Sequence, residues 1–158
     1  MRGLLESRDF QVKDNVFSLT NYAKIRNEER RIKFLKGIDR KKIQTYYKEF
    51  ITPSISHMSL LQRFLVDGFF MDVLFLYFVL GVDASRRCMM GEDQDEVIEK
   101  TLEYNLYKIP AMATQTNLHQ YIDDWELHGI FVLAEEIAAS WLLEGIQYGI
   151  KQRKMRLL

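Results

Sequence analysis

The sequence predicts an all-α protein: a single-domain helical bundle of about five to six helices around a buried central helix. The central helix is predicted from residues 64–82, the most apolar stretch of the chain, which only Asp67 and Asp72 interrupt. A helix that is apolar nearly all round is buried in a soluble protein, with other helices packed against it. The sequence has only two prolines and eight glycines, which favours long helices over many short strands.

Residues 64–82 also invite comparison with a membrane-spanning helix, which needs about 20 mostly apolar residues. Strong apolar residues gain roughly 0.3–0.6 kcal/mol each on insertion and a central Asp costs roughly 2.5–3.5 kcal/mol, so the sum here lies near zero. The following segment, Gly81 to Ser85, is typical of a helix stop and a new N-cap. We therefore expect a buried core helix, with a membrane span or an apolar partner interface as alternatives.

The single cysteine, Cys88, excludes an intramolecular disulfide framework and a multi-cysteine zinc site. This pattern and the absence of an apolar leader at the N-terminus predict a cytoplasmic protein. Arg86 and Arg87 would lower the pKa of a reactive Cys88 thiol, but an inert, half-buried thiol is the preferred interpretation.

Residues 1–17 carry isolated apolar groups without a helical stripe and are expected to form an arm or irregular N-terminus. A helix is predicted to follow, from a cap at residues 18–21 to about Lys36, with Gly37 in the stop position.

Asp39 is the predicted N-cap of the next helix, which runs to about Ile51 and ends at Thr52–Pro53. The buried face of this helix is predicted to comprise Ile43, Tyr46, Tyr47 and Phe50.

The central helix is predicted to begin at Ser54 or Ser56 and to run to Leu80, a length of roughly 39 Å. Residues 83–90 are expected to form a short helical turn or a loop. Met58, Leu61, Phe64, Leu65 and Gly68 open the apolar face of the central helix.

Residues 92–96 place acidic groups in the first turn of a further helix, where they suit the helix dipole, and that helix should stop before Pro110. A short helix capped at Thr114 or Thr116 and containing Trp125 is expected next. The last helix is predicted to begin near residues 128–129.

The last helix carries Trp141, Gly145 and Gly149 on nearly one face. A glycine inside a helix costs about 1 kcal/mol relative to alanine, so two of them four apart indicate a close approach of another backbone. We predict that this helix crosses the central helix near Gly68.

Buried carboxylates need partners, so Asp72 is predicted to pair with an arginine. The candidates are Arg86, Arg87, Arg153 and Arg156.

No catalytic, cofactor or metal site is predicted. Asp67 and Asp72 lie about 140° apart around a helix and cannot share a ligand set. Asp124 and His128, with Glu135 on a later turn, could form half of a metal site, but no histidine follows a glutamate at the spacing of di-metal bundles. A carboxylate- and histidine-dependent metal enzyme remains the alternative function.

Charge is segregated although the net charge is zero. Residues 20–48 hold ten Lys and Arg residues, interleaved with aromatic residues, which could form a basic face for binding. Nucleic-acid binding by residues 24–48 is a second alternative, but solvated lysines and core-facing tyrosines are the preferred interpretation. The basic-face candidates are Arg30, Arg31, Arg40, Lys41 and Lys42.

The run from Val66 to Asp72, continued by Val79-Leu80-Gly81, resembles the "EGxxID…YLLG" segment of the YbaK-type family (DUF2521), short helical proteins of spore-forming Bacillus relatives. The C-terminal motif beginning Trp141-Leu142-Leu143-Glu144-Gly145 and ending at residues 151–157 resembles that family's "DWWxxG…KLRx" pattern. The resemblance covers roughly residues 64–158 and implies a helical fold in a Gram-positive cytoplasm, with no established activity to transfer.

Three positions depart from the family pattern. A family Glu falls at Leu76, the first Asp of the closing motif at Ser140, and its second Trp at Leu142. Any chemistry that depends on that Glu and Asp should therefore be missing here.

Long helices, segregated charge and the lack of catalytic groups together predict a non-enzymatic protein. Its predicted partner is another protein or a second copy of itself, without a small-molecule substrate.

Overall fold

The computed structural model describes residues 24–158, which form helices and, within that range, no β-strand. This confirms the predicted all-α fold class. The chain divides into two compact units, residues 1–36 and 37–158. The expected arm at residues 1–17 and the cap of the first helix lie outside the described residues, and one domain over residues 1–158 stays a prediction.

The described part of the first unit is a helix over residues 24–35, followed by a turn at residues 36–37. The guanidinium carbon of Arg30 lies 5.2 Å from the centre of the Phe34 ring. Such a cation–π contact stabilises one turn of the helix against the next. The predicted end of this helix near Lys36 is confirmed.

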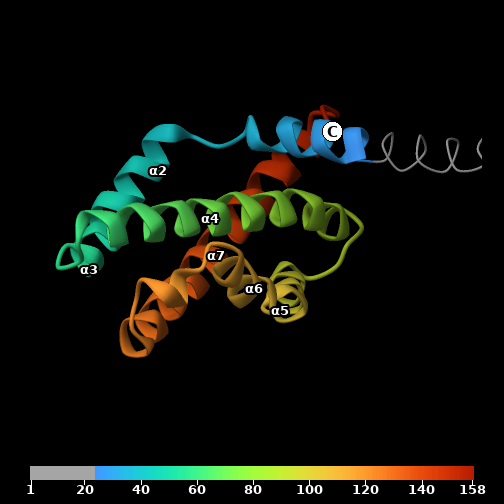
Figure 1. Ribbon diagram of the computed structural model, residues 1–158. Coiled ribbons are helices and arrows are strands. Elements are labelled where there is room, and N and C mark those ends of the chain that lie inside the picture. The colour runs from blue at the N-terminus through green and yellow to red at the C-terminus, as the bar shows by residue number, and fades with distance from the viewer. Residues whose placement is uncertain (1–23) are drawn as a thin grey trace, which may run out of the picture. The chain divides into compact units, whose positions relative to one another are not determined.

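The second unit contains two long helices and several shorter ones. In Figure 1, α4 (green) and α7 (orange to red) cross, and α5 and α6 lie on one side of this pair. The elements are α2 (Arg40–Tyr46), the π-helical turn η1 (Tyr47–Ile51), α3 (Thr52–Ile55), α4 (Leu60–Met89), α5 (Gln94–Asn105), α6 (Lys108–Gln115), the 3₁₀ turn η2 (Leu118–Gln120) and α7 (Asp124–Lys154).

The central helix α4 begins later and ends later than predicted. Its N-cap is Ser59, neither Ser54 nor Ser56, and Ser59 forms a reciprocal capping box with Gln62 at 3.1 and 3.2 Å. It then continues for 30 residues, about 45 Å, through Gly81 to Met89. The loop expected at residues 83–90 is therefore the last two turns of α4.

Gly81 does not stop α4, because it packs directly against the backbone of α7. A Cβ built on Gly81 would lie 3.0 Å from the Cα of Gly145, and a Cβ on Gly149 would lie 3.0 Å from the carbonyl oxygen of Val82. Only a residue without a side chain allows the two backbones to come this close. The predicted role of Gly145 and Gly149 in a helix crossing is thus confirmed.

The predicted counterpart on α4 is wrong. Nothing lies within 4 Å of a Cβ built on Gly68, which is exposed one face away from α7. The sequence predicted a helix stop at Gly81, whereas in the structure Gly68 and Gly81 both belong to α4, and the rotation of α4 about its axis turns Gly81 toward α7.

α4 and α7 run in the same direction. The Phe69 ring lies 6.4 Å from the Phe131 ring, and further along both helices Arg153 Nε donates to Ser85 Oγ at 2.8 Å. The connection between these helices, residues 90–123, therefore has to return along the length of α4.

The α2 segment is helical further than predicted, because η1 leads without a break into α3. Pro53 lies in the first turn of α3, where its missing N–H is not needed, and so it does not end the helical segment. The π turn also changes which side chain faces inward. Ile51 is 1% exposed and Phe50, predicted to be buried, is 58% exposed.

The helix boundaries after α4 agree in part with those predicted from the sequence. Asp93 caps α5, and Asp95 and Glu96 lie in its first turn as predicted. α5 ends at Asn105, before Pro110 as predicted, while Pro110 itself lies inside a further helix, α6. Neither Thr114 nor Thr116 caps the next element.

Trp125 does not belong to a short separate helix. It lies in the first turn of α7, which begins at Asp124 with Asp123 as its N-cap, four residues before the predicted start.

The core lies around α4, as predicted. Phe70, Leu74 and Phe78 are buried, and the buried Tyr77 hydroxyl donates to the carbonyl of Asn105 at 2.7 Å. Within residues 24–158, α4 alone is long and apolar enough to cross a membrane, and half of its most apolar stretch is buried in the protein.

Candidate functional site

A cavity of about 400 Å³ lies between α2, η1 and α7; we call it the α2–α7 cavity. Three aromatic residues from three elements contribute to its lining: Tyr46, Phe50 and Trp141. The Tyr46 ring centre is 5.1 Å from that of Phe50 and 5.9 Å from that of Trp141, with the latter pair at 87°. The rings therefore line the cavity in different planes.

The π turn η1 accounts for the position of Phe50. A π turn holds more residues than an α turn and is found frequently at functional sites. Here it moves Ile51 into the core and leaves Phe50 beside Tyr46 at the cavity wall. In the regular helix that the sequence predicts, Phe50 was expected to be buried.

The charged residues around the α2–α7 cavity have a net negative balance. Lys42 Nζ is paired with Glu144, at 2.9 and 3.1 Å from its two carboxylate oxygens. Asp39, Glu49 and Lys41 complete the charged lining. An ion pair at this partly exposed position contributes little stability but fixes the distance between α2 and α7.

Burial raises the pKa of the Tyr46 phenol above its usual 10.0, and the charge of Glu136 raises it further, while a hydrogen bond with Ser140 acts in the opposite direction. Tyr46 therefore stays neutral under ordinary conditions. Its ring keeps the electron-rich face of an uncharged phenol.

Trp141 is buried, and no group among the described residues accepts a hydrogen bond from its Nε1. An unpaired buried donor usually costs about 1–3 kcal/mol. The predicted structural role of Trp141 is consistent with this burial, but its ring is held by packing alone. The sequence analysis singled out Trp141 for its place on the last helix, whereas it assigned both Tyr46 and Phe50 to the buried face of their helix.

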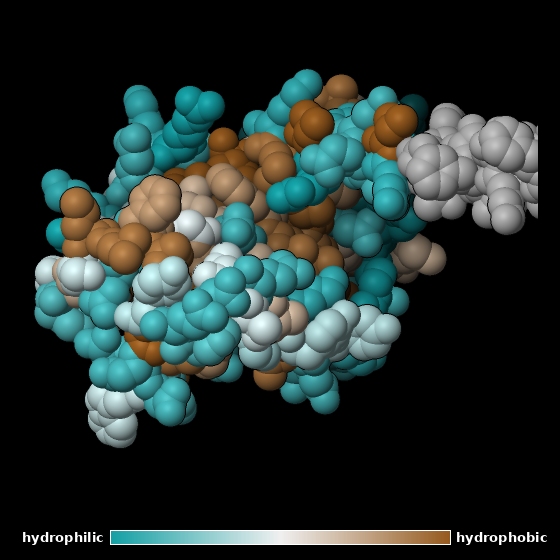
Figure 2. All heavy atoms as spheres, in the orientation of Figure 1, coloured by the Kyte–Doolittle hydropathy of each residue, from teal (hydrophilic) through white to brown (hydrophobic). Residues whose placement is uncertain are grey.

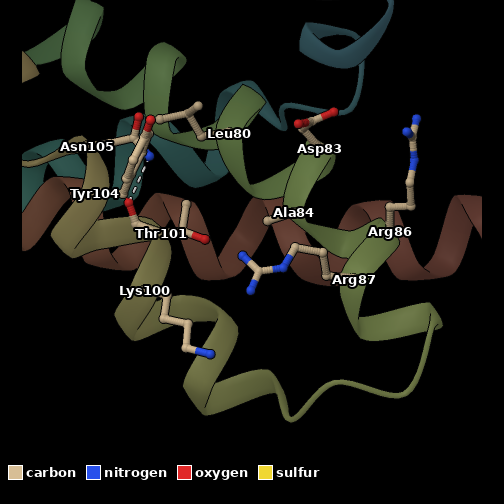
Figure 3. A pocket seen from close by; sticks show the side chains of 9 residues that line it. All are labelled: Leu80, Asp83, Ala84, Arg86, Arg87, Lys100, Thr101, Tyr104 and Asn105. Carbon is tan, nitrogen blue, oxygen red and sulfur yellow. Dashed lines mark hydrogen bonds between the residues drawn. The ribbon is translucent and has the colours of Figure 1, made fainter.

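A second cavity, of about 350 Å³, lies between α4 and α5 (Figure 3). Figure 3 shows Arg87 reaching toward the gap between the helices, and Arg86 and Asp83 pointing away from α5. Arg87 is already neutralised, because its Nη2 lies 2.8 Å from Glu92 Oε2. This cavity holds basic groups that point in different directions and is the weaker candidate.

Cys88 lies near this cavity and is half-buried. Burial and the charge of Glu92 raise the pKa of its thiol, and the opposing effect of Arg87 is smaller. The interpretation of Cys88 as an inert thiol is supported over that of a reactive one.

The two aspartates of α4 have different surroundings. Asp67 accepts a hydrogen bond of 2.5 Å from the Tyr47 hydroxyl. Asp72 is exposed, so the predicted arginine partner is wrong: a carboxylate in water needs none. Arg153 instead donates to the Ser85 hydroxyl and to the carbonyl oxygen of Val82. Both acceptors lie at the helix crossing, next to Gly149.

Arg156, another candidate partner of Asp72, lies beyond the end of α7 with a left-handed backbone, φ 58°, and is exposed. Among the described residues, no contact joins Arg156 to Asp72, so the predicted structural role of Arg156 has no support from such a pair.

The carboxylate and histidine candidates for a metal site are not brought together. Asp124, His128 and Glu135 are exposed on α7, and within residues 24–158 no group of three or more His, Cys, Asp or Glu side chains is placed to hold a metal ion. A different pair forms instead, between His57 Nε2 and Glu126 Oε1 at 3.1 Å.

The predicted basic face is divided between the two units. Arg30 and Arg31 belong to the first, and Arg31 pairs with Glu28 at 3.9 Å. Arg40, Lys41 and Lys42 belong to the second, where Lys42 is held by Glu144. Lys41 and Lys42 line the α2–α7 cavity.

An exposed apolar surface lies where α4 and α7 begin; we call it the end surface. It was not predicted, because its residues were assigned to the core or to a short helix. Figure 2 shows hydrophobic side chains gathered on the left, over the start of α4. The end surface comprises Leu60, Leu61, Phe64, Tyr121 and Trp125, of which Leu60, Phe64 and Trp125 are 78%, 73% and 87% exposed.

Two contacts join the start of α4 to the start of α7. Gln62 Nε2 donates to the carbonyl of Tyr121 at 2.9 Å, and the His57–Glu126 pair joins the turn before α4 to the first turn of α7. The start of α4 and the start of α7 thus share one end of the second unit.

The comparisons with known proteins found no match: no family model, no curated protein and no solved structure is similar to this chain at a significant level. The resemblance to the YbaK-type family therefore stays a prediction.

Proposed function

We propose that this is a non-enzymatic, cytoplasmic helical protein that acts by protein–protein interaction, and that it self-associates through the end surface. The observation that carries the proposal is the exposure of Leu60, Leu61 and Phe64 at the start of α4, and of Tyr121 and Trp125 near the start of α7. Large apolar surfaces exposed on a soluble protein mark interaction sites.

The size of the end surface fits a second copy as the occupant. Its exposed side chains present roughly 600 Å², given the areas usual for aromatic and aliphatic side chains. This is close to the roughly 800 Å² that each partner buries in a standard interface. Polar groups at the rim would supply the remaining buried area.

The rim of the end surface is also self-complementary in charge. Arg63 on α4 is partly exposed, and Asp123 and Asp124 lie exposed at the start of α7. In a two-fold dimer the same patch meets itself, so the α4 side of one copy can face the α7 side of the other. Opposite charges would then meet across the interface.

Light scattering on the purified protein across a range of concentrations tests the proposal. We expect a mass of twice 18.8 kDa at high concentration, and a shift to the monomer in Phe64→Ser and Trp125→Ser. Tyr104→Ser is the matched control, because Tyr104 is an exposed aromatic residue on α5, outside the end surface.

A monomer at every concentration would overturn self-association. If a different protein then co-purified from the native host and was lost in Trp125→Ser, the end surface would be an interface for that protein instead.

A further inference from the structure

We propose that the α2–α7 cavity binds an alkylated organic ammonium ion. This site is separate from the end surface and does not depend on self-association. The inference rests on the ring arrangement and on the charge balance of the lining.

The ring arrangement suits a rounded cation. Aromatic faces attract an ammonium group that lies within about 6 Å of the ring centre, and cages of several rings recognise quaternary ammonium ions. Tyr46 is shared by two ring pairs, at 39° to Phe50 and at 87° to Trp141. Walls in different planes enclose a tetrahedral group better than parallel walls would.

The charges favour a cation over an anion. Lys42 is neutralised by Glu144, which leaves Asp39 and Glu49 against Lys41 in the lining. Glu136 adds to the negative potential at Tyr46. An anionic ligand would meet this excess of carboxylates without a free pair of basic groups to receive it.

The cavity can also adapt to a ligand. The buried Trp141 ring is fixed by packing, so adaptation has to come from the exposed rim of the cavity. Phe50 is more than half exposed and belongs to the π turn, so its side chain can close over a bound group. A volume of about 400 Å³ has room for a trimethylammonium group and part of its chain.

Choline and its neutral isostere 3,3-dimethyl-1-butanol test the proposal directly, because the two have the same shape and differ in charge. Binding is followed by tryptophan fluorescence in a Trp125→Phe background, where Trp141 is the remaining tryptophan of the two in the chain. We expect choline to bind with a millimolar Kd, and the alcohol to bind at least about ten-fold more weakly.

Phe50→Ala is expected to weaken choline binding about five-fold or more, since one cation–π wall is worth about 1 kcal/mol. Glu49→Gln should weaken it by a smaller factor. Both residues are exposed, so neither change should disturb folding. Tyr104→Ala is the matched control and should leave the Kd unchanged.

Three results would overturn the proposal: no choline binding up to about 100 mM, equal affinity for the neutral alcohol, or unchanged affinity in Phe50→Ala. Trimethyl-lysine and phosphatidylcholine vesicles, titrated in the same way, distinguish a protein side chain or a lipid headgroup from a free metabolite as the source of the cation.

Discussion

Three glycines determine how closely α4 and α7 pack. Gly81 and Gly145 face each other, and Gly149 lies against Val82 and Ser85. At such a contact the backbones gain dispersion energy along their length, and any added carbon atom has to push one helix away. The spacing of Trp141, Gly145 and Gly149 made this half of the crossing predictable from the sequence.

Gly145→Leu is expected to destabilise the protein by about 3 kcal/mol or more, because its side chain would collide with the carbonyl of Phe78 and the Cα of Gly81. Gly68→Ala is the matched control on the same pair of helices. It fills open space in a helix interior and should stabilise the protein by about 0.5–1 kcal/mol. Urea denaturation of both variants measures the difference, and a stable Gly145→Leu variant would refute the backbone contact.

At the scale of elements, the sequence predicted which segments are helical better than where the helices begin and end. Asp39 was identified as a cap because it precedes a helical apolar pattern, and in the structure it accepts the Lys41 N–H; Asp93 was placed only among the acidic residues of a first turn, and in the structure it caps α5. The continuation of α4 through Gly81 could not be predicted, since a glycine at a helix stop and a glycine at a helix crossing look alike in one sequence.

The π turn was also beyond sequence reasoning. Its hydrogen bonds follow no residue preference that distinguishes them from those of an α-helix, and only the packing of Ile51 and Ile55 into the core selects it. Because Phe50 depends on that turn, the α2–α7 cavity could not be assembled from the sequence, although Tyr46, Lys42 and Trp141 were each singled out.

The capping box of α4 gives a prediction at this scale. Ser59→Ala removes the acceptor for the Gln62 N–H and should lower the free energy of unfolding by about 1 kcal/mol. Ser56→Ala is the control, since the Ser56 hydroxyl donates to the carbonyl of Pro53 and does not cap the start of α4. Equal losses in the two variants, measured by thermal denaturation, would contradict this assignment of the N-cap.

At the scale of the whole molecule, buried tyrosines make stability depend on pH in the alkaline range. Burial raises the pKa of Tyr77 from 10.0 to about 12. Burial and the hydrogen bond to Asp67 raise the pKa of Tyr47 above 10.0 as well. A pKa raised by folding means that the stabilisation is fully present below pH 10 and is lost as pH rises through the folded value.

The free energy of unfolding should therefore fall by about 2 kcal/mol or more between roughly pH 10 and 12. Tyr47→Phe removes one of the two groups and should flatten that slope. Tyr104→Phe, which changes an exposed tyrosine on α5, should leave it as it is. Urea denaturation at a series of pH values measures the slopes, and identical slopes in the three proteins would contradict the contribution of Tyr47.

The parallel course of α4 and α7 affects how the chain reaches this structure. The groups that meet at the crossing, such as Ser85 and Arg153, are 68 positions apart, so the contact closes a long loop and forms late. During synthesis α4 leaves the ribosome first, and the apolar side that α7 will cover stays open to water until α7 has followed. Until α7 has been synthesised, the nascent chain exposes its most apolar helix, which makes it a substrate for chaperones and vulnerable to aggregation.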